Sequence, residues 1–118
     1  MKKISLIVFV LVSFLSSAQT NVSTTPENKN VVLEEFTGIS CPYCPDGHAI
    51  AAGIKNNNPG DVMLINIHTG GYATPQGAGT DFRTNYGAAL ATNASVSGYP
   101  TGSINRVGPS MSRGDWAG

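Results

Sequence analysis

The sequence has little charge and little cysteine, and both shortages narrow the classes of protein that it can encode. Charged residues make up only 12% of the 118 residues, and seven Lys and Arg balance seven Asp and Glu. A nucleic-acid-binding protein needs a basic patch, so we expect no nucleic-acid partner. Two cysteines are too few to stabilise a small secreted domain through several disulfides, so their spacing says more about their role than their number does. Fourteen glycines and seven prolines mean many turns and argue against a helical bundle.

The first 18 residues have the form of a secretory signal peptide. Lysines at positions 2 and 3 precede an almost wholly apolar run from Ile4 to Leu15, and small residues at 16–18 make a cleavage site. We therefore expect cleavage after Ala18. The alternative is an uncleaved membrane anchor, but a run of about a dozen residues is short against the roughly 20 that a membrane span requires. We expect no membrane span in the mature protein.

The signal predicts that the mature protein leaves the cytoplasm for the periplasm, the outer membrane or the cell surface. Disulfides can persist in such compartments. Loss of the two lysines of the signal leaves five basic residues against seven acidic ones, which is a net charge near −2.

The rest of the chain divides into a flexible leader at 19–30 and one domain at 31–118. Turn residues separate its apolar and helical segments. Their βαβ-α-β order predicts an α/β fold with a parallel pair of strands joined through the first helix. Because the chain stops soon after the last strand, we expect a fragment that lacks the closing C-terminal elements. The expected elements are a strand at 31–36, a helix at 45–57, a strand at 61–68 buried on both faces, a Gly-rich loop at 69–80, a helix at 81–94 with Asp81 as N-cap, and a strand at 101–107.

The motif Cys41-Pro42-Tyr43-Cys44 lies between the first strand and the first helix. At the start of a helix its two sulfurs can come within disulfide range, and the positive end of the helix favours a thiolate on the first cysteine. This context indicates a redox dithiol. A structural disulfide is an alternative, as is a zinc or copper site completed by His48 or His68. Covalent haem is excluded because Pro45 stands where C-x-x-C-H requires a histidine.

Two separated segments resemble the thioredoxin superfamily. The first is Val31–Phe36, followed after four residues by Cys-Pro-Tyr-Cys, a variant familiar from glutaredoxins. The second is the segment 96–101, Val-Ser-Gly-Tyr-Pro-Thr, which is similar to the thioredoxin segment in which a cis-proline precedes a strand. With Gly47-His48 and the stretches 33–38 and 98–102, the chain more narrowly resembles the outer-membrane-protein-twenty-eight-related family of exported Gram-negative proteins. The resemblance covers about residues 31–106 and implies a thioredoxin-like fold.

The resemblance implies a role for three residues around the motif. Cys41 matches the attacking cysteine of the superfamily and Cys44 the resolving cysteine, and we expect the two to form a disulfide. Glu35 matches the buried carboxylic acid that handles the proton of the resolving cysteine. Because strand side chains alternate, Glu35 should be buried beneath the dithiol and Glu34 should be solvated. Cys41 should be the more exposed of the two cysteines.

The resemblance also implies a substrate groove. Pro100 matches the cis-proline, so we expect a cis bond between Tyr99 and Pro100, and Thr101 completes the substrate-binding set. The chain departs from the superfamily at Ser40, where a Trp is common, and this should expose the first sulfur. It also departs at Pro45, which removes an amide donor from the first helical turn.

Two functions remain open at this point. The first is an exported thiol–disulfide oxidoreductase that acts on protein thiols or disulfides of the cell envelope. The second is a non-catalytic thioredoxin-fold envelope or surface binding protein with a structural disulfide. Fold does not decide between them. For both functions we expect no cofactor and no metal.

Overall fold

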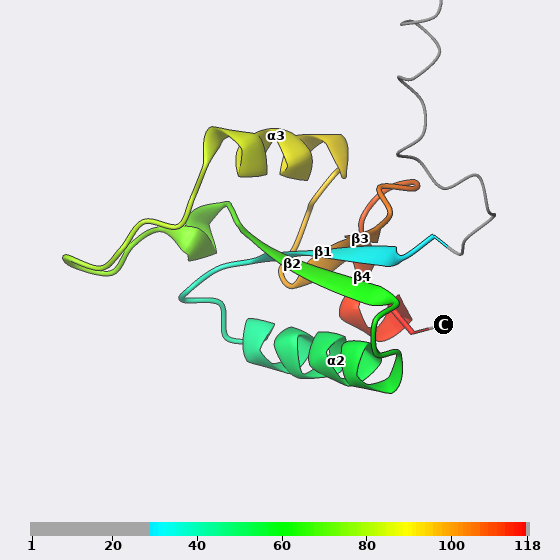
Figure 1. Ribbon diagram of the computed structural model, residues 1–118. Helices are drawn as coiled ribbons and strands as arrows, with labels where there is room; N and C mark the ends of the chain where they lie inside the picture. Colours follow the sequence, from blue (N-terminus) through cyan, green and yellow to red (C-terminus); the bar gives the residue numbers. More distant parts are fainter. Residues whose placement is uncertain (1–28, 118) are drawn as a thin grey trace, which may run out of the picture.

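The computed structural model describes residues 29–117 and contains one mixed β-sheet between two α-helices (Figure 1). The strands lie in the order β2-β1-β3-β4. The strands are β1 (Val31–Thr37), β2 (Val62–His68), β3 (Thr101–Ile104) and β4 (Met111–Ser112), the α-helices are α2 (Cys44–Asn57) and α3 (Asn85–Asn93), and two short 3-10 helices are η2 (Gly71–Ala73) and η3 (Arg113–Asp115).

β1 is an interior strand with a parallel and an antiparallel neighbour. It pairs with β2 in parallel from Val31 opposite Val62 to Thr37 opposite His68, and it pairs with β3 in antiparallel. The predicted α/β class and the parallel βαβ unit are therefore confirmed, and the arrangement is compatible with a thioredoxin-like core. The predicted signal peptide and most of the leader lie outside the described residues. Within 29–117, no helix has the length and apolar character to cross a membrane.

Each face of the sheet has its own apolar core, and α2 and α3 lie on opposite faces (Figure 1). On the α2 face, buried Leu33 packs with Ala51 and Trp116. Ile50 and Ile54 lie one turn apart on the helix and pack against the same cluster. On the α3 face, buried Phe36 of β1 packs with Ile67 and Ala94. The interior strand is thus covered on both faces at its C-terminal half.

β2 is not buried on both faces, so that prediction is wrong. Met63 is 55% exposed and Ile65 is 39% exposed, whereas Ile67 is only 7% exposed. The reason is that α3 has nine residues and packs against Ile67 at one end of the strand. The long apolar run in the sequence therefore belongs to an edge strand of this sheet and not to a fully covered one.

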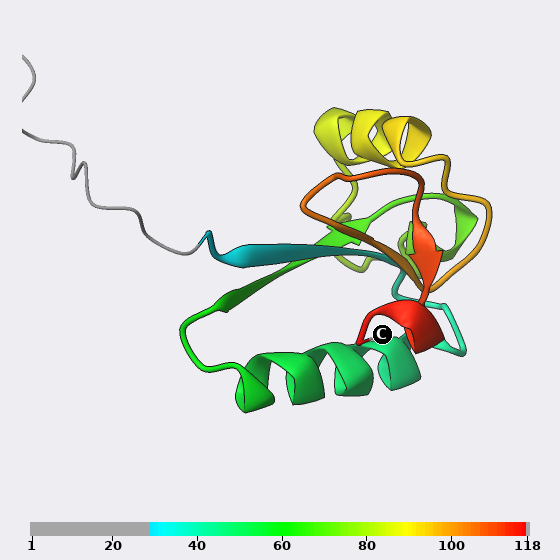
Figure 2. The same cartoon turned by 90° about the vertical axis from the view of Figure 1, so that its right-hand side faces the viewer.

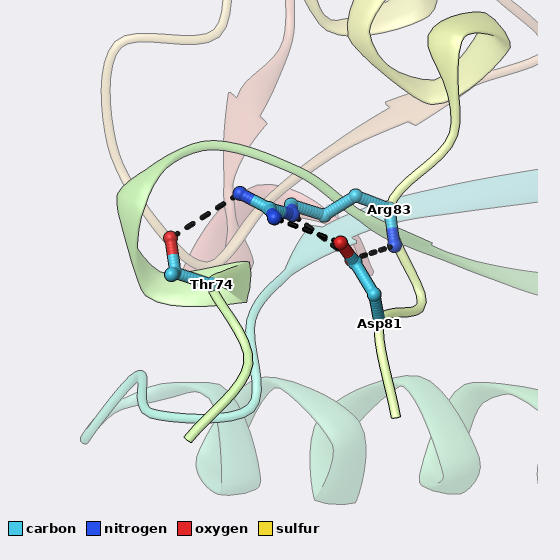
Figure 3. Close-up of polar contacts among 3 residues, drawn as sticks. All are labelled: Thr74, Asp81 and Arg83. Carbon is cyan, nitrogen blue, oxygen red and sulfur yellow. Dashed lines mark hydrogen bonds and ion pairs between the residues drawn. The ribbon is translucent and has the colours of Figure 1, made fainter. Parts of the chain in front are cut away.

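The second helix begins later than predicted, because Asp81 does not cap it. The N-cap is Thr84, whose Oγ1 accepts the N–H of Gly87 at 2.9 Å. Asp81 instead accepts from the backbone and the guanidinium of Arg83, and Arg83 also donates to Thr74 across the Gly-rich loop (Figure 3). These bonds lower the pKa of Asp81 to about 2. The carboxylate of Asp81 is bonded to Arg83 and does not accept an N–H from the first turn of α3.

The strand predicted at 101–107 ends at Ile104, because Asn105 and Arg106 have φ of 53° and 57°. This left-handed conformation terminates a strand and turns the chain. Asn105 is held there by its side-chain Oδ1, which accepts the N–H of Val32 at 2.9 Å. After the turn the chain returns as β4, which pairs with β3. β4 therefore gives β3 a second neighbour, although this strand has only two residues.

Candidate redox site

Cys41 and Cys44 form a disulfide at the N-terminal end of α2, as predicted. Their Cα atoms lie 5.4 Å apart, within the ordinary range for a disulfide. Cys41 precedes the helix, Tyr43 is its N-cap, and Cys44 is its first residue. Pro45 occupies the second position, where a missing N–H costs no helical hydrogen bond. The sequence therefore places both sulfurs at the positive end of the helix macrodipole.

Both cysteines are buried, although Cys41 is the more exposed at 5% against 1% for Cys44. The prediction that Cys41 is the more exposed of the two cysteines is therefore confirmed. The expectation that Ser40 uncovers the first sulfur is wrong. The N–H and the hydroxyl of Ser40 both donate to the carbonyl of Tyr72, at 3.0 and 2.9 Å. These two hydrogen bonds hold the segment around Tyr72 next to the Cys-x-x-Cys motif.

Glu35 lies on the α2 face of β1 and is 1% exposed, as predicted. Its Oε2 lies 2.9 Å from Nδ1 of His48 on α2. Its Oε1 is buried and has no hydrogen-bond partner among the described residues. Burial raises the pKa of Glu35 above its ordinary value of 4.5, and the charge and hydrogen bond of His48 oppose this rise in part. The raised pKa makes this carboxyl group a better proton acceptor than an exposed glutamate, so it can take up a proton and return it.

Gly47 brings Glu35, α2 and Pro100 into contact. A Cβ atom at position 47 would lie 2.7 Å from Oε1 of Glu35 and 2.8 Å from Cγ of Pro100. Both groups therefore pack directly on the helix backbone, and only glycine leaves them room. Gly47 lies three residues after Cys44, so it shares a helix face with that cysteine. The free oxygen of Glu35 is thus directed at the helix face that carries Cys44.

The predicted cis bond between Tyr99 and Pro100 is confirmed. Pro100 is buried against α2, and the ring of Tyr99 makes an edge contact with Tyr72, their centroids being 6.0 Å apart. Thr101 lies in β3, and its hydroxyl donates to the carbonyl of Met111 at 2.7 Å. Tyr99 and Pro100 therefore lie at the motif end of the sheet, whereas the Thr101 side chain serves the pairing of β3 with β4.

Glu34 is not solvated, so the prediction for this residue is wrong. It is 3% exposed on the α3 face, where Arg106 pairs with it. Nε of Arg106 lies 3.0 and 2.9 Å from the two carboxylate oxygens. Alternation along the strand assigned the two glutamates to opposite faces correctly. It did not show that the second face is also covered.

Three residues of the site were missed or undervalued by the sequence analysis: Gly47, Tyr72 and Arg113. Arg113 of η3 pairs with Asp46 in the first turn of α2 and lies over the ring of Tyr43. Figure 2 shows η3 beside the start of that helix. The position of Gly47 on the helix face of Cys44 could have been read from the sequence. The other two come from segments far from the motif.

His48 and His68 do not form a metal centre with the cysteines. Among residues 29–117, no three side chains of His, Cys, Asp or Glu gather as metal ligands. His68 ends β2 and packs against Phe82, with ring centroids 5.2 Å apart. Burial lowers the pKa of His68, and the nearby charge of His48 lowers it further. His48 instead bonds Glu35 and, through Nε2, the hydroxyl of Thr37 at 3.3 Å.

The chain shares its fold with a solved structure. A crystal structure of a protein from Agrobacterium tumefaciens matches 76% of this chain with a TM-score of 0.58 and 18% sequence identity. This chain covers 41% of that protein. No family model matches the sequence, and no curated protein matches it. At this identity the likeness concerns the fold alone.

Proposed function

We propose that the chain is an exported thiol–disulfide oxidoreductase of the thioredoxin-like superfamily, related to the outer-membrane-protein-twenty-eight-related family. Its clients would be protein thiols or disulfides in the envelope of a Gram-negative bacterium. The observation that carries the proposal is the Cys41–Cys44 disulfide at the start of α2, one helical turn before Gly47, where Pro100 and the free oxygen of a buried carboxyl group pack on the helix. A disulfide that served only to hold the fold would need neither the carboxyl group nor its position.

The chemistry follows from the order of the two sulfurs. In the reduced form, the thiolate of Cys41 attacks a client disulfide, and the first client sulfur leaves as a thiolate. Cys44 then gives its proton to Glu35 and attacks the sulfur of Cys41. The intramolecular disulfide forms, and the second client sulfur leaves. The same steps in reverse would oxidise a client dithiol, so the direction depends on the redox partners.

A second function is supported by the burial of the cysteines. At 5% exposure, Cys41 offers little surface to a client disulfide, and a structural disulfide in a binding protein would be expected to be buried in this way. The two functions differ in the reduction potential of the Cys41–Cys44 pair. A value below about −300 mV indicates a structural bond, and one between about −270 and −120 mV indicates a working couple.

A trapping experiment tests the proposal directly. The Cys44→Ser variant, expressed with its N-terminal segment, should accumulate mixed disulfides with envelope proteins, because attack proceeds and resolution does not. The matched Cys41→Ser variant should trap nothing. Reductant-sensitive bands of higher mass on a non-reducing gel, seen with the first variant alone, support the oxidoreductase. If neither variant forms adducts and the wild-type bond resists reduction, the binding protein is the better description.

A further inference from the structure

A hydrogen-bonded path connects the buried carboxyl group of Glu35 to the protein surface. Oε2 of Glu35 lies 2.9 Å from Nδ1 of His48, and the His48 side chain is 40% exposed, against 2% for that of Glu35. Nε2 of the same ring lies 3.3 Å from Oγ1 of Thr37, which is fully buried. The imidazole is thus held at both nitrogens, while the side chain as a whole stays partly exposed.

Glu35 cannot exchange a proton with bulk water by itself. It is 1% exposed, and Gly47 and Pro100 close over its free oxygen. A carboxyl group that takes a proton from Cys44 must lose that proton before it can act again. Among the residues described, His48 is the group bonded to Glu35 that also contacts solvent.

We propose that His48 carries the proton between Glu35 and solvent, and so sets how fast the dithiol of this protein closes. This inference rests on the proposed function. His48 acts through Glu35 and is a positioning residue, since it contacts neither sulfur in the bonds described above. The two oxygens of Glu35 have different tasks: Oε1 faces the helix turn of Cys44, and Oε2 faces His48.

The proton and the electrons can be followed through the closing step. The Cys44 thiol gives its proton to Oε1 of Glu35, and its sulfur electron pair forms the bond to the sulfur of Cys41. The bond from Cys41 to the client sulfur breaks, and the client leaves as a thiolate that takes a proton from water. The carboxyl group of Glu35 then rotates and gives this proton to Nδ1 of His48, and the imidazolium releases its Nε2 proton to solvent, either directly or through the Thr37 hydroxyl that this nitrogen contacts.

Three elements near Glu35 and His48 carry further titratable or charged groups. Cys44 and Asp46 lie on α2 itself, and Asp46 is paired with Arg113 of η3. His68 from the end of β2 is close enough for the charge of His48 to affect its titration. The rate of the closing step therefore has to be measured in the His68→Gln background as well, so that an effect of His68 is not attributed to His48.

The test follows closure of a defined mixed disulfide. The reduced full chain is mixed with oxidised glutathione, samples are quenched with acid, and the Cys41–glutathione adduct and the closed disulfide are counted by mass. We expect His48→Ala to slow decay of the adduct at least tenfold at pH 7. The control substitution Asn56→Ala, at an exposed position of the same helix two turns away, should leave the rate unchanged. Free imidazole should restore much of the lost rate, because the site left by His48 opens to solvent.

The double mutant of Glu35 and His48 distinguishes a proton relay from a structural effect, because the rate losses of two residues in one relay are not additive. Glu35→Gln should slow closure at least as much as His48→Ala, and the double variant should be no slower than Glu35→Gln alone. Additive losses, or a loss that imidazole does not restore, overturn the relay. So does a His48→Ala variant that closes at the wild-type rate, and the proposed function then survives. If the wild-type protein forms no adduct and does not close, the proposed function fails, and the relay fails with it.

Discussion

Arg106 closes over the buried carboxylate of Glu34 with its Nε, while its own side chain is 62% exposed. The two residues are 72 positions apart in sequence and join β1 to the turn after β3. The pair also borders a cavity of about 190 Å³ that Leu90 and Ala94 of the α3 side line. The buried carboxylate of Glu34 is thus paired with a guanidinium whose side chain is mostly exposed to solvent.

Removal of Arg106 should destabilise the fold more than its exposure suggests. Arg106→Ala leaves Glu34 buried without its partner, and an uncompensated buried charge is costly. We expect Tm to fall by several degrees, whereas Arg83→Ala, which breaks an ion pair between two exposed residues, should change it little. Glu34→Gln should recover part of the loss in the Arg106→Ala background. Equal effects of the two arginine substitutions would contradict this account.

Two glycines of α2 should respond in opposite directions to alanine. Gly47→Ala adds a Cβ that meets Oε1 of Glu35 and the Pro100 ring, and overpacking of this kind costs about 1–3 kcal/mol. Gly53→Ala meets nothing within 4 Å and should stabilise the helix by about 0.5–1 kcal/mol. Urea unfolding of both variants gives the two free energies. A stabilising Gly47→Ala would show that the contact can relax.

Burial of Glu35 predicts a decline of stability with pH. Its pKa in the folded protein lies above the ordinary 4.5, so the folded state keeps a proton that the unfolded chain loses. The free energy of unfolding should therefore fall as pH rises from about 4.5 through the raised pKa, by about 1.4 kcal/mol for each unit of difference. Urea midpoints between pH 4 and 8 measure this. Glu35→Gln should remove the decline, and a variant with the same slope as the wild type would refute the assignment.

The capping residue of α3 can be identified by substitution. Thr84→Ala removes the acceptor for the N–H of Gly87 and should destabilise the protein by about 1 kcal/mol. Asp81→Ala breaks exposed bonds to the backbone N–H and the guanidinium of Arg83 and should have a smaller effect. Thermal unfolding of the two variants compares them. A larger loss from Asp81→Ala would return that residue to the capping role predicted from the sequence.

The sequence predicted the parts of the site that depend on local pattern. The position of the Cys-x-x-Cys motif before a helix and the burial of Glu35 follow from a strand, a turn and an alternation of side chains. The cis bond at Pro100 came from the resemblance of a short segment. The pairing of Glu35 with His48 could have been predicted from the sequence. Strand alternation places Glu35 on one face of β1, and helix spacing places His48 on the side of α2 that packs against that face.

Other features depend on contacts that local pattern does not contain. Glu34 was assigned to solvent because a second covered face, closed by Arg106, cannot be seen from alternation alone. Asp81 and Thr84 are both good N-caps, and the choice between them was made by Arg83, which occupies the carboxylate. The apolar run of β2 has the composition of a buried strand, but the short α3 covers only one end of it.

The bonds from Arg83 to Asp81 and Thr74 have a practical consequence for the segment 75–80. They tie its two ends, and the segment between them projects away from the sheet (Figure 1). Added length in a loop whose ends are held costs little, about 0.6 kcal/mol for each doubling. A reporter group or a short peptide inserted between Gln76 and Gly77 should leave Tyr72 and the disulfide in place, and would place an optical probe on the loop that Tyr72 connects to the candidate site, without a change to any residue of that site.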